Sequence, residues 1–222
     1  MKKSILTLAV FISFMANAQE LPKNFNELVK IIEPQLIGWR HHFHEFPELS
    51  NREFNTGKYI ADFLRTIGLE VKHPFAKTGV VAILKGNKPG PVIGLRADID
   101  ALPVTERAPI AFASKVKADY NGQQVNVMHA CGHDAHTAIL MATAKALKDM
   151  QKDLAGTVVF LFQPAEEGAP NNEEGGAKLM IKEGAMDAPK LDVVFGLHMA
   201  AQLPTGMLSY KSGAAQASSD LF

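Results

Sequence analysis

Four short apolar runs, separated by stretches of helical periodicity, constrain the fold of this chain more than any other feature. The runs occupy residues 80–84, 92–95, 158–162 and 193–197, and their length and composition are typical of buried strands. Helical spacing of apolar side chains occupies residues 24–46, 50–67, 135–150 and 176–183. Because strands alternate with helices, we predict an α/β fold with a mixed, largely parallel sheet flanked by helices.

Local signals predict where the helices begin, bend and end. Pro34 lies inside the first helical stretch and should kink it or begin a second helix. Ser50 and Glu53 have the spacing of a capping box for the next helix, which Gly68 should end. Asp134 should cap the third helix. The core face of that helix is expected to comprise Ile139, Leu140, Thr143, Leu147 and Met150.

The N-terminus has the three parts of a secretory signal peptide. Lys2 and Lys3 precede an apolar run over residues 5–15, and the Ala-Asn-Ala sequence of residues 16–18 matches a signal-peptidase site. The apolar run is too short to span a bilayer comfortably. We therefore expect a signal peptide at residues 1–18 and a protein that is secreted or periplasmic.

The charge balance limits the classes of partner. The chain has 23 basic and 23 acidic side chains, and its formal net charge is zero. A chain without a basic field is not suited to binding nucleic acid or an anionic membrane, so we expect neither as a partner. The hydrophobic fraction of 47% is enough for a sizeable core.

Cys131, the only cysteine, lies in the densest cluster of reactive side chains, residues 128–136. Its thiolate and the imidazole of His133 point the same way if the backbone is extended, and such a pair suits zinc-like ions. Asp134 or a backbone carbonyl would orient the imidazole. The alternative is a helix start with a buried, inert cysteine.

Further polar side chains follow the predicted strands. Glu166 and Glu167 follow the third run; one carboxylate could bind a metal ion while the other takes a proton from water, although acidic pairs are also common in solvated loops. His198 follows the fourth run, where a structural histidine is the alternative. Asp98 follows the second run and could pair with Arg96, orient a ligand or touch the metal. Because ligands bind where such strands end, these positions together predict a metal site.

Residues 129–136, His-Ala-Cys-Gly-His-Asp-Ala-His, resemble the HACGHDxH signature of the M20 metallopeptidase family, in its amidohydrolase branch. That branch includes hippurate hydrolases, N-acyl-amino-acid amidohydrolases and plant auxin-conjugate hydrolases. Four further segments resemble the landmarks of the family in the same order, and they are residues 44–49, 96–103, 163–168 and 196–198. The resemblance covers nearly the whole chain after the expected signal peptide.

The resemblance implies a zinc-exopeptidase-like catalytic domain that binds two divalent ions, Mn²⁺ or Zn²⁺, with Co²⁺ or Ni²⁺ as alternatives. The metal ligands implied are Cys131, His133, Glu167 and His198. Glu166 would be the general base, and Asp98 a supporting acidic residue of the catalytic site. The implied reaction is hydrolysis of the amide bond of an N-acyl amino acid or a similar small amide. A homodimer is expected for the full-length protein.

The sequence departs from the family in two ways. Residues 169–174 lengthen the segment after the glutamate pair. Family members are also much longer, with an inserted dimerisation or lid domain and a return to the catalytic domain that supplies another histidine ligand. We therefore expect residues 19–211 to be the N-terminal part of the catalytic domain, and residues 212–222 to begin a truncated dimerisation or lid domain.

Three alternatives remain open from the sequence. Cys131 with His133 or His198 would suit a cysteine hydrolase, which should survive a chelator and be inactivated by iodoacetamide. An inactive fragment would bind metal and hydrolyse nothing. The same metal chemistry on a different substrate would make the protein a dipeptidase or a carboxypeptidase.

Overall fold

The computed structural model describes residues 25–213. The expected signal peptide and all but the first two residues of the expected truncated domain lie outside this part of the chain. The helices are α1 (Phe25–Glu45), α2 (Phe54–Thr66), α3 (His133–Asp149) and α4 (Gly176–Lys182). The strands are β1 (Glu70–Phe75), β2 (Gly79–Lys85), β3 (Lys88–Asp98), β4 (Lys117–Tyr120), β5 (Gln123–Asn126), β6 (Ala155–Gln163) and β7 (Val193–Gly196). Among the helices of residues 25–213, none combines the length and the apolarity needed to cross a bilayer.

Five of the strands form one sheet in the order β1-β2-β6-β3-β7. β3 pairs in parallel with both β6 and β7, whereas β2 pairs antiparallel with both β1 and β6. Within this sheet, therefore, only β2 runs against the direction of the other strands. The prediction of a mixed, largely parallel sheet flanked by helices is confirmed.

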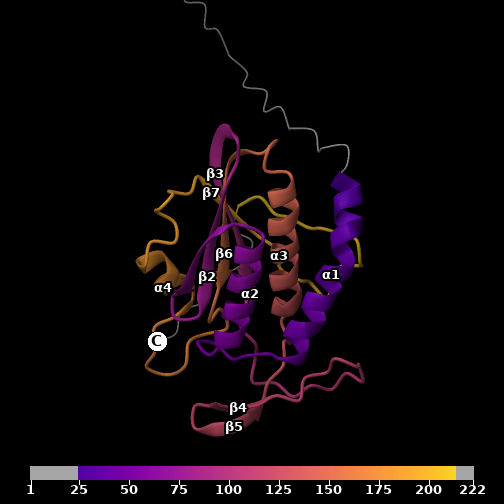
Figure 1. Ribbon diagram of the computed structural model, residues 1–222. Coiled ribbons are helices and arrows are strands. Elements are labelled where there is room, and N and C mark those ends of the chain that lie inside the picture. The colour runs from indigo at the N-terminus through magenta and orange to yellow at the C-terminus, as the bar shows by residue number, and fades with distance from the viewer. Residues whose placement is uncertain (1–24, 214–222) are drawn as a thin grey trace, which may run out of the picture.

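The sheet lies between two layers of helices, with α1, α2 and α3 on one face and α4 on the other (Figure 1). Successive side chains of β2 point to opposite faces. Val80 and Ala82 therefore join the hydrophobic core under α1, α2 and α3, whereas Val81 and Ile83 join the smaller core under α4. Phe160 of β6 is fully buried in the larger core. The candidate site lies where the parallel strands β3, β6 and β7 end.

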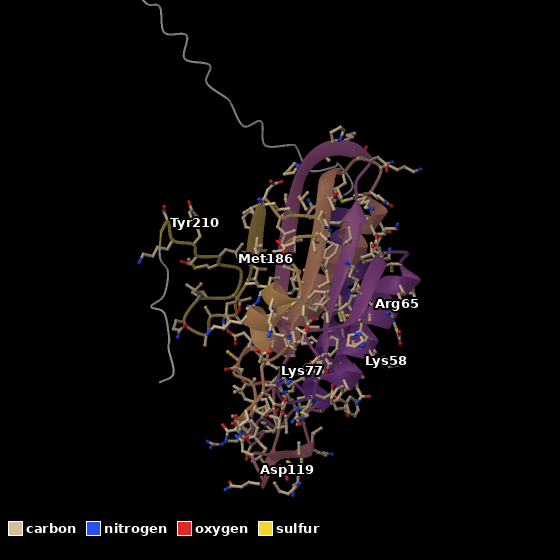
Figure 2. All side chains as sticks on the ribbon, turned by 90° about the vertical axis from the view of Figure 1, so that its left-hand side faces the viewer. Lys58, Arg65, Lys77, Asp119, Met186 and Tyr210 are labelled. Atoms are coloured by element: carbon tan, nitrogen blue, oxygen red, sulfur yellow. The ribbon has the colours of Figure 1, made fainter. Side chains whose placement is uncertain are left out.

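Two features of the fold were not predicted from the sequence: the edge strand β1 and the β4–β5 hairpin. β1 alternates exposed and half-buried residues and contains no apolar run, which is why it escaped prediction. The hairpin projects beyond the end of the sheet, and Asp119 lies at that extremity (Figure 2). Asn121 and Gly122, with φ angles of 52° and 81°, form its turn. An Asn-Gly pair is a strong hairpin signal and could have revealed it.

The capping-box prediction for α2 is wrong. Ser50 donates its hydroxyl hydrogen to the carboxylate of Asp100, and Glu53 is itself the N-cap residue, fully buried, with no side-chain capping hydrogen bond. The Glu48 carboxylate accepts hydrogen bonds from the backbone N–H groups of Asn55, at 3.2 Å, and Thr56, at 2.8 Å. Glu48 therefore satisfies N–H groups that the helix itself leaves unpaired.

The predicted start and core face of α3 also need correction. The helix begins at His133, two residues earlier than expected, and its N-cap residue is Gly132. Asp134 lies inside the first turn, where its carboxylate binds side chains of α1. Of the predicted core face only Leu140 is buried; the buried side chains are largely small, and they include Ala138, Ala142, Ala144 and Ala146. Such side chains let α3 approach its neighbours closely, so large apolar residues were a poor guide to its packed face.

Candidate metal centre

Three parallel strands end at the same edge of the sheet, and the side chains there form the candidate site. Asp98 is the last residue of β3, Glu166 and Glu167 follow β6, and His198 follows β7. His133, the first residue of α3, meets them there. The Nε2 atom of His133 lies 3.6 Å from a carboxylate oxygen of Asp98. It lies 3.8 Å from one of Glu166 and 3.7 Å from one of Glu167. The structure thus brings together side chains from four separate segments.

His133 is held so that one ring nitrogen is free to bind a cation. Its Nδ1 atom lies 2.8 Å from the backbone carbonyl oxygen of Asp100. A carbonyl oxygen only accepts hydrogen bonds, so Nδ1 carries a hydrogen, and in the neutral imidazole, the form that binds a metal ion, the lone pair is on Nε2. Nε2 is buried and has no hydrogen-bond partner within residues 25–213. Of the two orienting groups predicted, the backbone carbonyl is the one observed, since Asp134 binds His44 instead.

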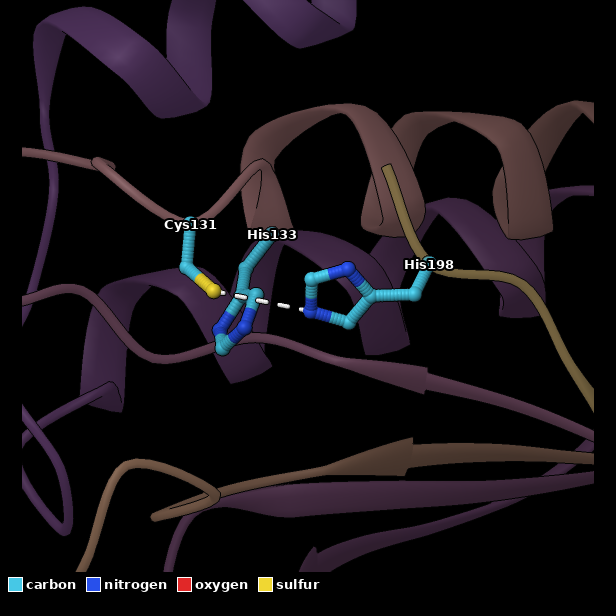
Figure 3. Close-up of side chains that lie close together, drawn as sticks. All are labelled: Cys131, His133 and His198. Carbon is cyan, nitrogen blue, oxygen red and sulfur yellow. Dashed lines mark hydrogen bonds between the residues drawn. The ribbon is translucent and has the colours of Figure 1, made fainter. Parts of the chain in front are cut away.

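Cys131 and His198 lie side by side next to His133 (Figure 3). The Cys131 Sγ atom is 3.5 Å from Nε2 of His198, whose Nδ1 donates a hydrogen bond to the carbonyl oxygen of Met199 at 2.7 Å. The backbone between Cys131 and His133 is not extended, because Gly132 has a φ of 89°. A Cβ atom at Gly132 would lie 2.8 Å from the Met199 side chain, so glycine lets the segment after β7 approach the start of α3.

The donor atoms of this cluster fit divalent metal ions. Three groups each have ligand atoms within 4.8 Å of one another, and His133 belongs to all three. The groups are Cys131, His133 and His198; Asp98, His133 and His136; and His133, Glu166 and Glu167. Thiolate, imidazole and carboxylate donors together suit zinc and neighbouring transition metals. The buried, unpartnered Nε2 atom of His133 is the nitrogen that such an ion would satisfy.

The electrostatics of the cluster also favour a cation. Burial, a hydrogen bond with Glu167 and the charges of nearby carboxylates raise the pKa of the Cys131 thiol to about 12. Burial lowers the pKa of His133, but hydrogen bonding to Asp100 and the charge of Asp98 outweigh burial and raise it to about 9. Negative charge therefore dominates around these donors, and a divalent ion among them would offset it.

Asp98 is buried and fully engaged, so it is not placed to act as a free base. One carboxylate oxygen accepts from Nδ1 of His136 at 2.5 Å, and the other accepts from Arg96 at 2.8 Å. Burial alone would raise the pKa of Asp98, but His136, His133 and Arg96 lower it to about 2. The ion pair with Arg96 considered from the sequence is present, and the same carboxylate also faces His133.

His136 is a site residue for which no function was predicted from the sequence. Its Nδ1 atom binds Asp98, so Nε2 accepts a hydrogen bond from the backbone N–H of Met199 at 2.8 Å. His136 thereby links the end of β3 to the segment that carries His198. Its position three residues after His133, on the same face of a helix, was the signal that could have identified it.

A second buried charged network supports the start of α3 from outside the cluster. His44 of α1 binds Asp134 through Nδ1 at 2.9 Å and Glu106 through Nε2 at 2.7 Å. Hydrogen bonds to the two carboxylates outweigh burial and raise the pKa of His44. Arg40 also binds Asp134, at 3.3 Å. The network ties α1 and the loop around Glu106 to the residue that follows His133.

Comparison with known proteins agrees with this geometry. The sequence profile of Peptidase family M20/M25/M40 matches residues 94–213. N-acetyl-L-cysteine deacetylase of Bacillus subtilis is 42% identical over 191 residues, which are 86% of this chain and 42% of that protein. Thermostable carboxypeptidase 1 of Saccharolobus solfataricus is 41% identical over 204 residues, which are 91% of this chain and 49% of that protein.

A solved structure shares both the sequence similarity and the fold. It is a dinuclear metal-binding peptidase of the M20 family from Bacillus subtilis, 43% identical, with a TM-score of 0.69 over 79% of this chain and 45% of that one. The chain spans about half the length of the curated relatives it matches. The profile match over residues 94–213 covers more than half of the 222 residues and includes all six site residues predicted from the sequence. The chain belongs to Peptidase family M20/M25/M40.

Proposed function

We propose that this sequence belongs to a metal-dependent amidohydrolase that hydrolyses the amide bond of N-acyl amino acids. The observation that carries the proposal is the convergence of a thiol, imidazoles and carboxylates around the unpartnered Nε2 atom of His133. The substrate class is supported by a relative whose name is N-acetyl-L-cysteine deacetylase. Cys131, His133, Glu167 and His198 would hold two divalent ions, with Mn²⁺ or Zn²⁺ the first candidates.

The ions would polarise the substrate carbonyl and lower the pKa of water at the site. Glu166 would take the proton. Its side chain is 36% exposed, and burial together with the charge of Asp98 raises its pKa, which makes it a better proton acceptor. Glu166 removes a proton from the water that attacks the amide carbon. As the carbon–nitrogen bond breaks, it passes that proton to the leaving amine, giving a carboxylic acid and a free amino acid.

Asp98 would supply a negative charge at the site and hold neighbouring side chains in place, and it would not transfer a proton. Its pKa of about 2 keeps it ionised at neutral pH. It faces His133 at 3.6 Å and holds His136, so its negative charge lies beside the proposed ions. This is the supporting acidic function proposed for it.

The test replaces Glu166 by Gln and measures hydrolysis of hippurate together with bound metal. The expected result is a loss of kcat of about 100-fold or more with near-normal metal content, because Gln cannot accept the proton. Glu174→Gln is the matched control, since Glu174 pairs with Lys182 on the exposed surface of the same segment. Equal loss of metal and activity in Glu166→Gln would contradict its function as the base.

A cysteine hydrolase is the main rival, because Cys131 and His198 lie 3.5 Å apart. A thiol with a pKa of about 12 is protonated at neutral pH and is a weak nucleophile. We therefore expect a chelator to abolish hydrolysis and divalent metal to restore it. Activity that persists in the chelator and disappears with iodoacetamide would favour the rival.

Peptide hydrolysis is a second candidate function, favoured by a relative whose name is thermostable carboxypeptidase 1. The two candidates share the same chemistry and differ in whether the acyl side carries a free amine. Comparing kcat/KM for hippurate with that for an unblocked dipeptide separates them, and we expect hippurate to be the better substrate.

Export of the protein is also proposed, on the signal-peptide pattern of residues 1–18. N-terminal sequencing of secreted or periplasmic material should then begin at Gln19. Homodimerisation of the whole protein is proposed as well, and light scattering should give twice the mass of one chain.

A further inference from the structure

Glu166 is carried by a short turn with an uncommon backbone. Residue Ala165, directly before it, has a φ of 49°, in the left-handed region that favours glycine. For alanine this conformation is strained, so it persists only where the surroundings impose it. Ala165 is also buried, with 4% of its surface exposed. Something in the fold must therefore hold this turn.

Glu53 holds the turn from one side. It precedes α2, is fully buried, and accepts a hydrogen bond through Oε1 from the backbone N–H of Ala165 at 2.8 Å. Its other oxygen, Oε2, accepts from the hydroxyl of Thr78 at 2.6 Å. A Cβ atom at Gly57 would lie 2.1 Å from the Thr78 carbonyl oxygen, so the glycine lets α2 approach the start of β2 and brings Glu53 to Thr78.

Asp100 holds the turn from the other side. Its Oδ2 atom accepts a hydrogen bond from the backbone N–H of Glu167 at 3.0 Å and from the hydroxyl of Ser50 at 2.7 Å. The residues immediately before and after Glu166 thus each donate a backbone N–H to a buried carboxylate. The two carboxylates come from segments far away in the sequence, and Glu166 projects from between these anchored amides.

We infer that Glu53 is a positioning residue of the hydrolytic site, which fixes the direction of Glu166 by anchoring the backbone of Ala165. The inference rests on the proposed function for its effect on turnover, but the anchoring itself can be measured separately. Glu53 touches none of the proposed metal ligands through the hydrogen bonds it makes. Replacing Glu53 should therefore disturb the position of Glu166 and leave metal binding unchanged.

The charge of Glu53 is not required for this function. Burial and the nearby charge of Asp100 raise the pKa of Glu53, whereas its hydrogen bonds with Thr78 and Ala165 lower it. The rise is the larger effect, and the pKa is about 7. A protonated carboxyl can still accept from Ala165 through one oxygen while the other donates to Thr78. Gln can make the same two contacts, because its amide oxygen accepts and its NH₂ group donates. Glu53→Gln is therefore the variant that should preserve the turn.

The experiment compares Glu53→Ala, Glu53→Gln and Glu48→Ala in the metal-loaded protein. Glu48→Ala is the matched control, because Glu48 caps the same end of α2 and makes its hydrogen bonds to Asn55 and Thr56. Glu53→Ala should lower kcat for hippurate by about 100-fold, the cost typical of a misplaced catalytic group, with KM and metal content nearly unchanged. Glu53→Gln should keep kcat within a few-fold of the parent, and Glu48→Ala should lower only thermal stability.

Amide hydrogen exchange at Ala165 gives a readout that does not depend on activity. We expect protection of this amide in the parent and in Glu53→Gln, and its loss in Glu53→Ala. If Glu53→Ala does not fold, Thr78→Val, which removes the other partner of Glu53, should give a smaller loss of both kcat and protection.

Equal kcat in Glu53→Ala and Glu48→Ala would overturn the inference, as would a Glu53→Gln variant as impaired as Glu53→Ala. A parent protein that hydrolyses no amide would instead contradict the proposed function. In that case the exchange pattern at Ala165 would still decide whether Glu53 holds the turn.

Discussion

Replacing His44 by Ala should destabilise the protein strongly, because His44 is buried between two carboxylates and binds both of them. The side chains of His44, Glu106 and Asp134 are 7%, 7% and 3% exposed. Removing one partner of a buried ion pair costs roughly 3–5 kcal/mol, because a charge is left buried and unpaired. Here Asp134 keeps Arg40, and Glu106 keeps two backbone N–H donors. We therefore expect the lower end of that range, about 3 kcal/mol.

The effect should depend on pH in a defined direction. The pKa of His44 is raised above 6.5, so its stabilising contribution is complete below pH 6.5 and is lost as pH rises through the raised pKa. The pKa values of Glu106 and Asp134 are lowered from 4.5 and 3.8, so their contributions are present above those values and are lost in more acidic solution. The difference in unfolding free energy between parent and variant should be largest between about pH 4.5 and 6.5.

Urea denaturation of the metal-free protein across this pH range measures the difference. Arg40→Ala is the control, because Arg40 binds the same Asp134 carboxylate but its side chain is 47% exposed. It should cost at most about 1 kcal/mol, as exposed ion pairs do. A loss in His44→Ala that is no larger than in Arg40→Ala, or that is constant from pH 5 to 9, would show that His44 does not stabilise the fold through its two carboxylate partners.

Three further predictions concern packing and metal binding. Gly57→Ala should destabilise the protein by about 1–3 kcal/mol in urea denaturation, because the new Cβ atom would lie 2.1 Å from the Thr78 carbonyl oxygen. Gly38→Ala in α1 should stabilise it by up to about 1 kcal/mol, because the new Cβ atom would have no other atom within 4 Å. Equal effects of the two substitutions would contradict this explanation. Phe160→Ala, at a fully buried position, should lower the free energy of unfolding by about 3–5 kcal/mol. Phe54→Ala, at a position that is 58% exposed, should lower it by about 1 kcal/mol or less. Similar losses in the two variants would place Phe160 outside the core. Zinc should raise the Tm of the parent, and Cys131→Ser should reduce that rise, whereas an unchanged rise would remove the thiol from the metal site.

The sheet was predictable from sequence where strands are buried on both faces. The run 158–162 lies within β6, which is covered by helices on both sides, so nearly all of its residues are apolar. Because β3, β6 and β7 are parallel, their ends also predicted where the reactive side chains meet. Cys131 and His133 do lie together as predicted, although a left-handed glycine joins them where an extended backbone was expected.

The contacts that hold the site could not be predicted, because they join segments far apart in the sequence. Glu53 binds a backbone amide 112 residues away, and local spacing with Ser50 suggested a capping box in its place. His44 lies in a helix and binds Glu106 across 62 residues. Neither pairing leaves a periodic or local signature, since each depends on how the helices pack against the sheet.

The Cys131 sulfur and the imidazoles of His133 and His198 should bind divalent ions together. Zinc-edge X-ray absorption of the zinc-loaded protein can detect this shared site, because sulfur and nitrogen ligands give distinct shells. We expect a sulfur shell at about 2.3 Å that is present in the parent and absent in Cys131→Ser. A spectrum with only nitrogen and oxygen neighbours, the same in both proteins, would show that Cys131 does not bind the metal.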